Sequence, residues 1–231
     1  MGYLGIDAAW ICNEHIGIDS ETLRNIIRAG RASDIDVMVR RAYNGYDSLI
    51  QVLEMGAAGL MIPHCRDAAM VRDIVRDVKF PPLGRRGVDG VGGDSFYGSI
   101  RGVEYTAAAN AETFLMVQVE DAEAVEHIEA IAEVDGVDII FIGPLDLSYS
   151  LGVPGQLKHP RIVEVIGRTI EACRRNGKYC GTPGLDEAYT AELLDKGVRF
   201  ITGGGDFGVL RNGFAGMKAN FDELCSVHVP D

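Results

Sequence analysis

The alternation of short β-rich runs with amphipathic helical segments constrains this chain more than any other feature. Seven short runs are rich in apolar, β-branched and aromatic residues, as expected for buried strands. These runs are residues 8–14, 37–40, 60–63, 114–120, 137–142, 179–182 and 200–202. Between them lie segments with helical periodicity, and several of these segments are followed by glycine, a common helix terminator. The predicted helices are residues 20–29, 47–55, 68–78, 122–134, 160–176 and 185–196, with a last helix at about 214–224.

Repeated strand–helix units of this length predict a parallel sheet, either closed as a barrel or open and doubly wound. Polar or glycine-rich residues follow nearly every predicted strand, which favours a barrel because barrel enzymes gather their sites at the carboxyl ends of the strands. We therefore expect a TIM (β/α)₈ barrel and one domain spanning residues 1–231. Only seven strands are predicted and the chain starts almost directly in one, so the usual first β-strand at the N-terminus is not recognised.

The composition argues against two classes of binding partner. The 231 residues carry a net charge of −12 and 47% are hydrophobic, enough for a sizeable core but unsuited to nucleic acid or an anionic membrane. No apolar run reaches the roughly 20 residues that span a bilayer, and no secretory leader is recognisable. The five cysteines are widely spaced, which indicates neither a disulfide framework nor a zinc ribbon. We expect a cytoplasmic protein.

Two carboxylates stand at the ends of consecutive predicted strands. Glu120 closes "FLMVQVE" and Asp146 lies in "IFIGPLDLS". Adjacent parallel strands lie about 4.8 Å apart, so the two carboxylates can converge on one hard divalent cation such as Mg²⁺ or Mn²⁺, with water completing the shell. The alternative is that each carboxylate caps the helix that follows it. Strand alternation places Gln118 on the same face as Glu120, where it either supports this pocket or bonds the backbone.

Three further features at strand ends can carry chemistry. In "GPLD", the amides of Leu145 and Asp146 form either a small anion cradle or part of a plain tight turn. Arg40 shares a strand face with Met38, and its guanidinium can bind a carboxylate or stabilise an oxyanion, or it can be structural. His15 follows the first predicted strand, and an imidazole suits general acid–base catalysis, although an ordinary rim histidine is equally compatible with the pattern.

Other sites are less consistent with the pattern. Cys12, His15, His64 and Cys65 are zinc-ligand types, but their spacing is unusual and adjacent side chains in a strand point to opposite faces. No lysine closes a predicted strand, which argues against a Schiff-base aldolase. The glycines of "GGGDFG" fit either a phosphate site or close helix packing. The glycine-rich stretch from residue 80 to about residue 101 is either a lid, around residues 89–97, or disordered.

Taken in order, several motifs resemble the HpcH/HpaI aldolase family, whose type member is 4-hydroxy-2-oxoheptanedioate aldolase. They are "NEH" after an apolar strand, "VMVR", "FPPLGRRG", "AAANAE" leading to "VQVE", "DGVDIIFIGPLDLS" and a following "HP". The resemblance runs from about residue 5 to residue 210, and the segments around Glu120 and Asp146 are specific when taken together.

The resemblance implies a (β/α)₈ barrel that catalyses reversible, divalent-metal-dependent aldol cleavage to pyruvate, or a related 2-oxo acid, and an aldehyde. It implies Glu120 and Asp146 as ligands of Mg²⁺, Mn²⁺ or Co²⁺, His15 as the catalytic base and Arg40 as the contact to the pyruvyl oxygen. It further implies Gln118 beside the metal. It places the pyruvate carboxylate on the amides around Gly143, Pro144, Leu145 and Asp146. Family members commonly form hexamers that exchange C-terminal helices.

Three departures from the family pattern bear on function. Cys12 stands where the family often has the Asp that orients the histidine, Asp121 replaces a usual Thr, and the first strand is not recognised. Two alternatives follow. One is a citryl-CoA or malyl-CoA type of lyase, although the acidic chain shows no basic patch for CoA. The other is a noncatalytic 2-oxo-acid or metal-binding barrel.

Overall fold

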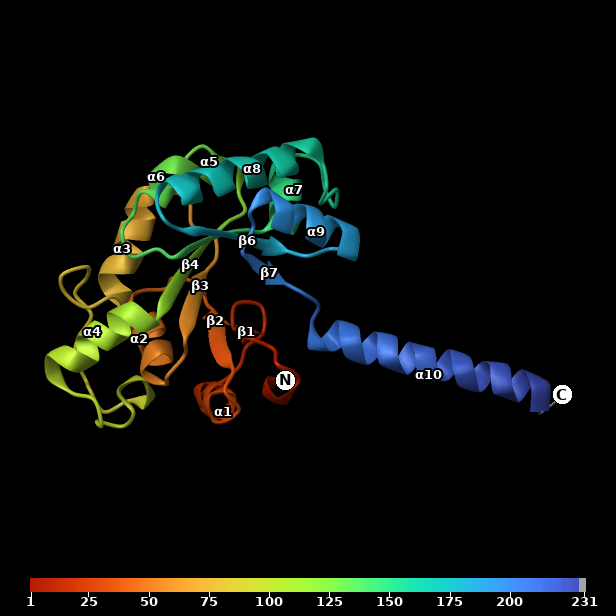
Figure 1. The fold of residues 1–231 in the computed structure, drawn as a ribbon, viewed down its shortest axis with the longest axis horizontal. Helices are drawn as coiled ribbons and strands as arrows, with labels where there is room; N and C mark the ends of the chain where they lie inside the picture. Colours follow the sequence, from red (N-terminus) through yellow and green to blue (C-terminus); the bar gives the residue numbers. More distant parts are fainter. Residues whose placement is uncertain (229–231) are drawn as a thin grey trace.

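Seven parallel strands in consecutive order form the centre of the computed structural model, which describes residues 1–228 (Figure 1). The strands are β1 (Ala8–Cys12), β2 (Asp36–Arg40), β3 (Gly59–Ile62), β4 (Phe114–Val119), β5 (Ile139–Ile142), β6 (Tyr179–Pro183) and β7 (Phe200–Thr202). Each strand pairs with the next one along the chain, as expected for right-handed strand–helix–strand units. The carboxyl ends of all seven strands therefore meet at one edge.

Helices follow the strands and cover the outer face of the curled sheet (Figure 1). They are α1 (Ser20–Ala32), α2 (Tyr46–Glu54), α3 (Ala68–Val78), α4 (Gly102–Glu112), α5 (Ala122–Val125), α6 (Ile128–Ala132), α7 (Pro144–Ser150), α8 (Pro160–Arg175), α9 (Glu187–Lys196) and α10 (Asp206–His228), with short 3₁₀ turns η1 (Gly2–Leu4) and η2 (Gly93–Ser95). Aspartates cap three of them: Asp19, Asp67 and Asp186 each accept backbone N–H groups at the start of α1, α3 and α9.

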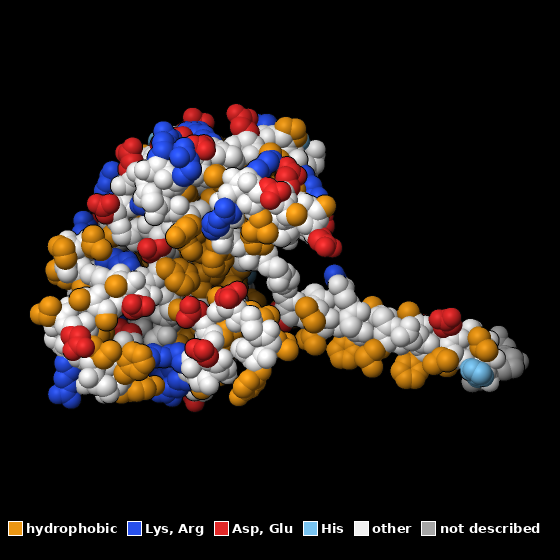
Figure 2. All heavy atoms as spheres, in the orientation of Figure 1, with side chains coloured by type: hydrophobic (Ala, Val, Ile, Leu, Met, Phe, Trp, Pro, Cys, Tyr) orange, Lys and Arg blue, Asp and Glu red, His pale blue; other side chains and the backbone are white. Residues whose placement is uncertain are grey.

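Strand alternation divides the apolar residues between two cores. Leu115, Val117 and Val119 of β4 face outward and join the main core between sheet and helices. Met116 faces inward and packs with Met38 and Phe141 inside the curl of the sheet. Figure 2 shows hydrophobic side chains gathered in this hollow of the molecule. The inner layer fills the base of the curl, so polar side chains one step further along the strands reach the open end.

The sheet is parallel and follows the chain order predicted for a barrel, but it has seven strands. Within residues 1–228, β1 pairs only with β2 and β7 only with β6, so the sheet is curled and not closed. The two edges still enclose one interior, because Trp10 of β1 and Phe200 of β7 both contact the Phe141 ring, with centroids 5.8 Å and 6.4 Å away. The expected eight-stranded closure is therefore not observed, since residues 1–228 supply seven strands.

Most element boundaries lie close to those predicted, with four differences, one of which is the short helix α7, for which no bounds were predicted. The helix expected over 122–134 is split into α5 and α6 at His127, whose backbone leaves the helical region. Helix α4 was not predicted, because its alanine-rich sequence lacks a strong apolar period. Helix α10 extends well beyond the predicted 214–224.

The glycine-rich segment after α3 is ordered and lies away from the strand ends. Arg86 is buried and donates to Asp94 Oδ2 at 2.6 Å, and the Tyr105 hydroxyl donates to the same oxygen at 2.6 Å. Arg31, in the last turn of α1, donates to the Gly93 carbonyl. These contacts hold the segment at the carboxyl ends of α1 and α2. It therefore does not form a lid over the strand ends of its own sheet, contrary to that expectation.

Helix α10 leaves the body and extends away from it (Figure 1). Its large apolar side chains are exposed and follow a three–four spacing at Phe207, Leu210, Phe214, Met217, Phe221 and Leu224. Figure 2 shows these hydrophobic atoms along one side of the helix. Over residues 1–228, no helix combines the length and apolar character needed to cross a membrane.

Candidate active site

Polar side chains from four neighbouring strands converge at the carboxyl edge of the sheet. Glu14 follows β1, Arg40 ends β2, His64 follows β3 and Glu120 follows β4. Parallel pairing in register brings these ends together, and the helices behind them exclude solvent from the deepest members. We call Glu14, Arg40, His64 and Glu120 the strand-end cluster.

Glu120 is the deepest member of the cluster. Its side chain is 1% exposed, the His64 backbone N–H donates to Oε1 at 2.9 Å, and Gln118 Nε2 donates to Oε2. Burial raises the pKa of Glu120 to about 7, and the charges of Asp146 and Glu14 add to this, although the bond and the charge from His64 oppose it. A carboxylate held this way, two residues from Gln118 on the same strand face, is well placed to take a cation.

Arg40 is held against β1. Its Nη2 donates to Cys12 Sγ at 3.1 Å, because Cys12 and Arg40 are partners in the β1–β2 register. Its Nε lies 3.1 Å from Glu14 Oε2 in an ion pair whose angle falls short of a hydrogen bond. The guanidinium also stacks over Trp10, 4.9 Å from the ring centroid. Arg40 is therefore fixed in orientation by contacts on three sides.

The contacts around Arg40 also affect the pKa of the Cys12 thiol. Burial acts to raise the pKa of the Cys12 thiol, but hydrogen bonds from Arg40 and from the backbone N–H groups of His15 and Glu14 outweigh it. The pKa therefore lies below its ordinary value. Position 12 lacks the carboxylate that the family often has there, but its sulfur still accepts a hydrogen bond from Arg40.

His64 stands between the carboxylates of the cluster. Its Nε2 lies 3.5 Å from Glu14 Oε1, and its Nδ1 lies 3.3 Å from Glu120 Oε1 and 3.4 Å from Asp121 Oδ2. Burial acts to lower the pKa of His64, but Glu120, Asp121 and Glu14 together raise it above its ordinary value. Its backbone adopts a positive φ of 52°, a region that histidine enters more readily than most residues.

Gly143 borders Glu120 on the side of β5. A Cβ at this position would lie 2.7 Å from Glu120 Oε2 and 2.6 Å from Gln118 Nε2, so only glycine leaves both groups in place. Pro144 opens α7, Leu145 is 53% exposed, and Asp146 is exposed in the first turn. The amides of that first turn have no intrahelical acceptor. Gly143 therefore lies beside Glu120, and Asp146 is near enough for its charge to raise the Glu120 pKa.

His15 occupies the rim of the site. Its side chain is 67% exposed, and its Nε2 lies 3.6 Å from Glu14 Oε2. It thus reaches the strand-end cluster through Glu14, and among the described residues no aspartate or glutamate other than Glu14 forms an ion pair with it. The structure places it at the mouth with His64, whose side chain is 55% exposed, whereas Glu120 lies buried below them.

The donor set of the cluster is rich in oxygen. Within residues 1–228, the buried Oε1 of the neighbouring Gln118 has no hydrogen-bond partner, and Glu14 Oε2 and Arg40 Nε share only their ion pair. Such atoms are costly unless something bonds them. No group of three or more His, Cys, Asp or Glu in the described part of the chain is arranged to hold a metal ion. A cation here would rest on two carboxylates, with other ligands completing its shell.

The zinc constellation considered from sequence is not formed. Cys65 is fully buried in the core between sheet and helices, and its thiol donates to the Ile62 carbonyl. Burial raises the pKa of Cys65 to about 12, which disfavours the thiolate that zinc requires. Its neighbour His64 faces the strand-end cluster instead.

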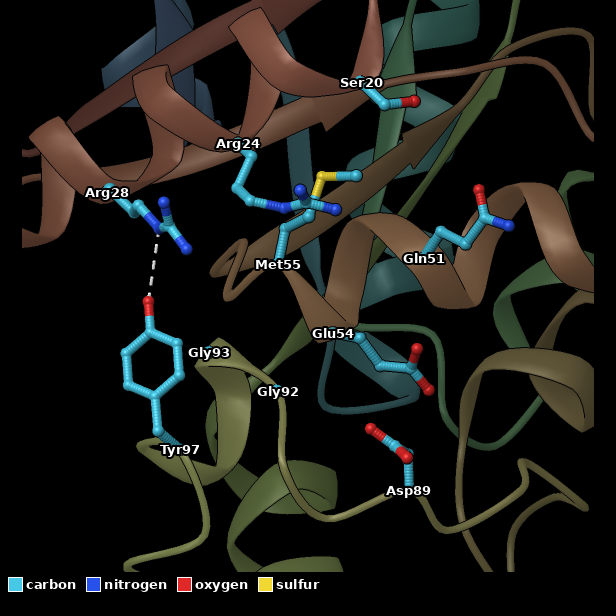
Figure 3. Close-up of a pocket in the computed structure, with 10 residues that line it drawn as sticks. All are labelled: Ser20, Arg24, Arg28, Gln51, Glu54, Met55, Asp89, Gly92, Gly93 and Tyr97. Atoms are coloured by element: carbon cyan, nitrogen blue, oxygen red, sulfur yellow. Dashed lines mark hydrogen bonds between the residues drawn. The ribbon is translucent and has the colours of Figure 1, made fainter.

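A separate cavity of about 460 Å³ lies outside this cluster, between α1, α2 and the glycine-rich segment (Figure 3). Arg24 and Arg28 form one wall, Glu54 and Asp89 the other, and Arg28 donates to the Tyr97 hydroxyl at 3.3 Å. It contains no residue predicted for the site. The strand-end cluster is the better candidate, because it combines buried carboxylates, unpartnered polar atoms and strand carboxyl ends.

Sequence reasoning missed three members of the site. Glu14 and His64 were counted among the polar residues at strand ends but were given no role beyond zinc binding for His64, and Asp121 was noted as a departure from the family pattern. The available signal was position, because each residue lies two residues beyond the end of a strand. Strand alternation could not place His64, because it applies only within the strand that ends at Ile62.

Comparisons with known proteins identify the family to which this chain is similar. A family model described as HpcH/HpaI aldolase/citrate lyase matches residues 20–213. The hydroxypyruvate/pyruvate aldolase of Roseobacter denitrificans is 37% identical over 213 residues, which are 92% of this chain and 82% of that protein. The 2-keto-3-deoxy-L-rhamnonate aldolase of Klebsiella pneumoniae is 41% identical over 170 residues, 73% of this chain and 63% of that protein. The crystal structure of an HpcH/HpaI aldolase from Desulfitobacterium hafniense DCB-2 superposes with a TM-score of 0.88 at 30% identity, covering 96% of this chain and 86% of that one.

Proposed function

The chain belongs to the HpcH/HpaI aldolase/citrate lyase family, and we propose that it cleaves a 4-hydroxy-2-oxo acid reversibly to pyruvate, or a related 2-oxo acid, and an aldehyde. Membership makes it an enzyme, a lyase of the aldolase type. The observation that carries the proposal is the buried Glu120 carboxylate, beside which Gly143 leaves space and whose pKa is raised by burial and by the nearby charges of Asp146 and Glu14. Two named aldolase relatives support the choice of a 2-oxo acid.

The residues at the strand ends fit a divalent cation. Glu120 and Asp146 supply carboxylate oxygens, Gln118 Oε1 is buried and unpartnered, and a Cβ on Gly143 would fill the space beside Glu120. This all-oxygen set suits Mg²⁺ or Mn²⁺, and Co²⁺ also accepts it. We propose Glu120 and Asp146 as the protein ligands. When bound, such an ion acts as a Lewis acid toward a 2-oxo acid.

Arg40 is proposed to bind the 2-keto oxygen of the substrate. The guanidinium is fixed by Cys12, Glu14 and Trp10, so it meets a developing oxyanion without reorganising. Its Nε is engaged with Glu14 at 3.1 Å, which leaves the outer nitrogens of the guanidinium to meet the substrate. Arg40 therefore stabilises negative charge on that oxygen as the carbon–carbon bond breaks.

The first turn of α7 is proposed to hold the substrate carboxylate. Gly143 and Pro144 bring the chain close to Glu120, and the amides of Leu145 and Asp146 are free to donate. Gln118 completes this wall from β4. The carboxylate and the keto oxygen are thereby oriented together, which sets the direction of the bond to be cleaved.

His15 is proposed as the general base. Its exposed imidazole at the rim can take the proton of the C4 hydroxyl as the C3–C4 bond breaks, directly or through water. Glu14, 3.6 Å from its Nε2, is the residue of this chain that orients the ring in place of the carboxylate missing at position 12. Reprotonation of the resulting enolate carbon then yields pyruvate.

The proposal also covers the closure of the barrel and the assembly of several copies of the chain. The seven strands are proposed to be part of an eight-stranded barrel, because Trp10 and Phe200 already enclose a common interior with Phe141. The exposed apolar face of α10 is proposed to pack against another copy of the chain in a homo-oligomer, a hexamer by family resemblance. This burial would remove from water an apolar stripe that a monomer rarely exposes.

A second candidate reaction is a citryl-CoA or malyl-CoA type of cleavage on the same site, which the family's breadth supports. A noncatalytic 2-oxo-acid-binding role is the third possibility. Incubating the protein with Mn²⁺, pyruvate and a panel of aldehydes, in parallel with CoA thioesters, separates them. We expect aldol adducts from pyruvate and no thioester cleavage; thioester cleavage alone, or oxalate binding without either reaction, would favour the alternatives.

A further inference from the structure

His64 connects two halves of the strand-end cluster that, within the described residues, share no other hydrogen bond or ion pair. One half is Arg40 with Glu14, at the ends of β1 and β2, where Arg40 Nε lies 3.1 Å from Glu14 Oε2. The other half is Glu120 with Gln118 on β4. The imidazole reaches Glu14 through Nε2, at 3.5 Å, and Glu120 through Nδ1, at 3.3 Å. A polar chain therefore runs from the arginine to the buried carboxylate through one ring.

The backbone at His64 is fixed from both sides. Its own N–H donates to Glu120 Oε1 at 2.9 Å, and the next N–H, from Cys65, donates to the Gln118 carbonyl at 3.1 Å. The fully buried Cys65 anchors the turn in the core. The positive φ of His64 is thus imposed by β4, and it directs the ring toward the carboxylates.

Three carboxylates surround this ring, since Asp121 Oδ2 also lies 3.4 Å from Nδ1. Without a group between them, Glu14 and Glu120 would repel each other in a poorly solvated site, and each would be free to turn away. A ring with a nitrogen toward each carboxylate restrains both at once. This arrangement resembles the outer partners that orient metal-binding side chains.

We propose that His64 is a positioning residue for the aldolase reaction: it holds Glu120 toward the divalent ion and Glu14 toward Arg40, so that both halves of the site face one substrate. The inference rests on the proposed function, because it assigns Glu120 to the ion and Arg40 to the keto oxygen. In this scheme His64 contacts neither the ion nor the keto oxygen. It acts through the carboxylates of Glu14 and Glu120.

The two ring nitrogens allow the two halves to be tested separately. Asparagine tolerates a positive φ and carries its amide where Nδ1 lies, so His64→Asn keeps the contacts to Glu120 and Asp121 but cannot reach Glu14. His64→Ala removes both contacts. His127→Asn, at an exposed histidine outside the site, is the matched control.

The experiment measures Mn²⁺ binding by calorimetry without substrate, and KM and kcat for Mn²⁺-dependent methyl-proton exchange of pyruvate, for the wild type and the three variants. We expect His64→Ala to bind Mn²⁺ about 10- to 100-fold more weakly. His64→Asn should recover most of that affinity while keeping a raised KM for pyruvate, and His127→Asn should match the wild type.

Wild-type Mn²⁺ affinity and wild-type KM in His64→Ala would overturn the inference, and so would a His64→Asn protein as weak in Mn²⁺ binding as His64→Ala. If the wild type binds Mn²⁺ but exchanges no pyruvate protons, the proposed function fails while the binding comparison still tests His64. If the wild type exchanges protons and His64→Ala does so equally well, only the role of His64 fails.

Discussion

Gly143 is the single residue whose size matters most to the site. Its backbone has a negative φ of −87°, so an alanine would suffer no backbone strain and the effect of its Cβ can be isolated. That Cβ would lie 2.7 Å from Glu120 Oε2. We expect Gly143→Ala to lower Mn²⁺ affinity and exchange activity by at least about tenfold, with a normal far-ultraviolet spectrum.

Gly167, inside α8, is the matched glycine for this comparison. A Cβ there would meet no atom within 4 Å, so Gly167→Ala should leave activity unchanged. It should stabilise the helix by about 0.5–1 kcal/mol and raise Tm by about 1–4 °C. Equal activity in the two alanine variants would show that the space beside Glu120 is not needed.

Cys12 gives a chemical test of the contact with Arg40. Its pKa lies below the ordinary value and it is partly exposed, whereas Cys65, Cys173 and Cys180 are buried with raised pKa values. In a Cys225→Ser background, iodoacetamide should therefore label Cys12 first. Oxalate bound at Arg40 should slow that labelling several-fold, as followed by mass spectrometry. Labelling at an unchanged rate with saturating oxalate would separate Cys12 from the substrate site.

Between elements, the ion pair of Arg168 with Glu129 ties α8 to α6. Arg168 Nε donates to Glu129 Oε1 at 2.7 Å and Nη2 contacts the other oxygen, so the pair is bidentate. The hydrogen bond from Arg168 holds the pKa of Glu129 below its ordinary 4.5. Because the folded-state pKa is depressed, the pair stabilises the fold above about pH 4.5 and loses this contribution as the pH falls through the folded-state value.

We therefore expect Arg168→Met to lower Tm by about 1–3 °C at pH 7, since both side chains are more than a third exposed and solvent screens them. The difference from the wild type should shrink below pH 4.5, as measured by calorimetry from pH 7 to pH 3. A difference in Tm that grows toward low pH would contradict this assignment.

At the scale of the whole molecule, α10 extends away from the body and has no buried residue among those that the structure describes. The side chains of Phe214 and Phe221 are 67% and 63% exposed on its apolar side, and Asn212 and Ala219 lie on the opposite side. We expect Phe214→Glu with Phe221→Glu to dissociate the oligomer into smaller species by sedimentation velocity. Asn212→Glu with Ala219→Glu introduces the same number of carboxylates and should leave the oligomer intact. Equal sedimentation of both double variants would argue against assembly through this face.

The sequence pattern predicted much of this architecture, for identifiable reasons. The apolar runs located all seven strands, and alternation along β4 placed Met116 in the interior and Glu120 at the open end. No apolar run in the sequence predicted an eighth strand, and the described sheet contains none. His64 could not be placed, because its direction depends on a positive φ imposed by contacts with β4, and the extent of α10 was obscured by its glycines.

The exchange of pyruvate methyl protons with deuterium tests the central claim most directly, because it requires enolate formation at the strand-end cluster and no aldehyde. We expect the wild type with Mn²⁺ to exchange these protons, as followed by proton magnetic resonance. The rate should fall at least about 100-fold in Glu120→Gln and after chelation with EDTA. Exchange by Glu120→Gln at the wild-type rate, or exchange that persists unchanged in EDTA, would contradict the account.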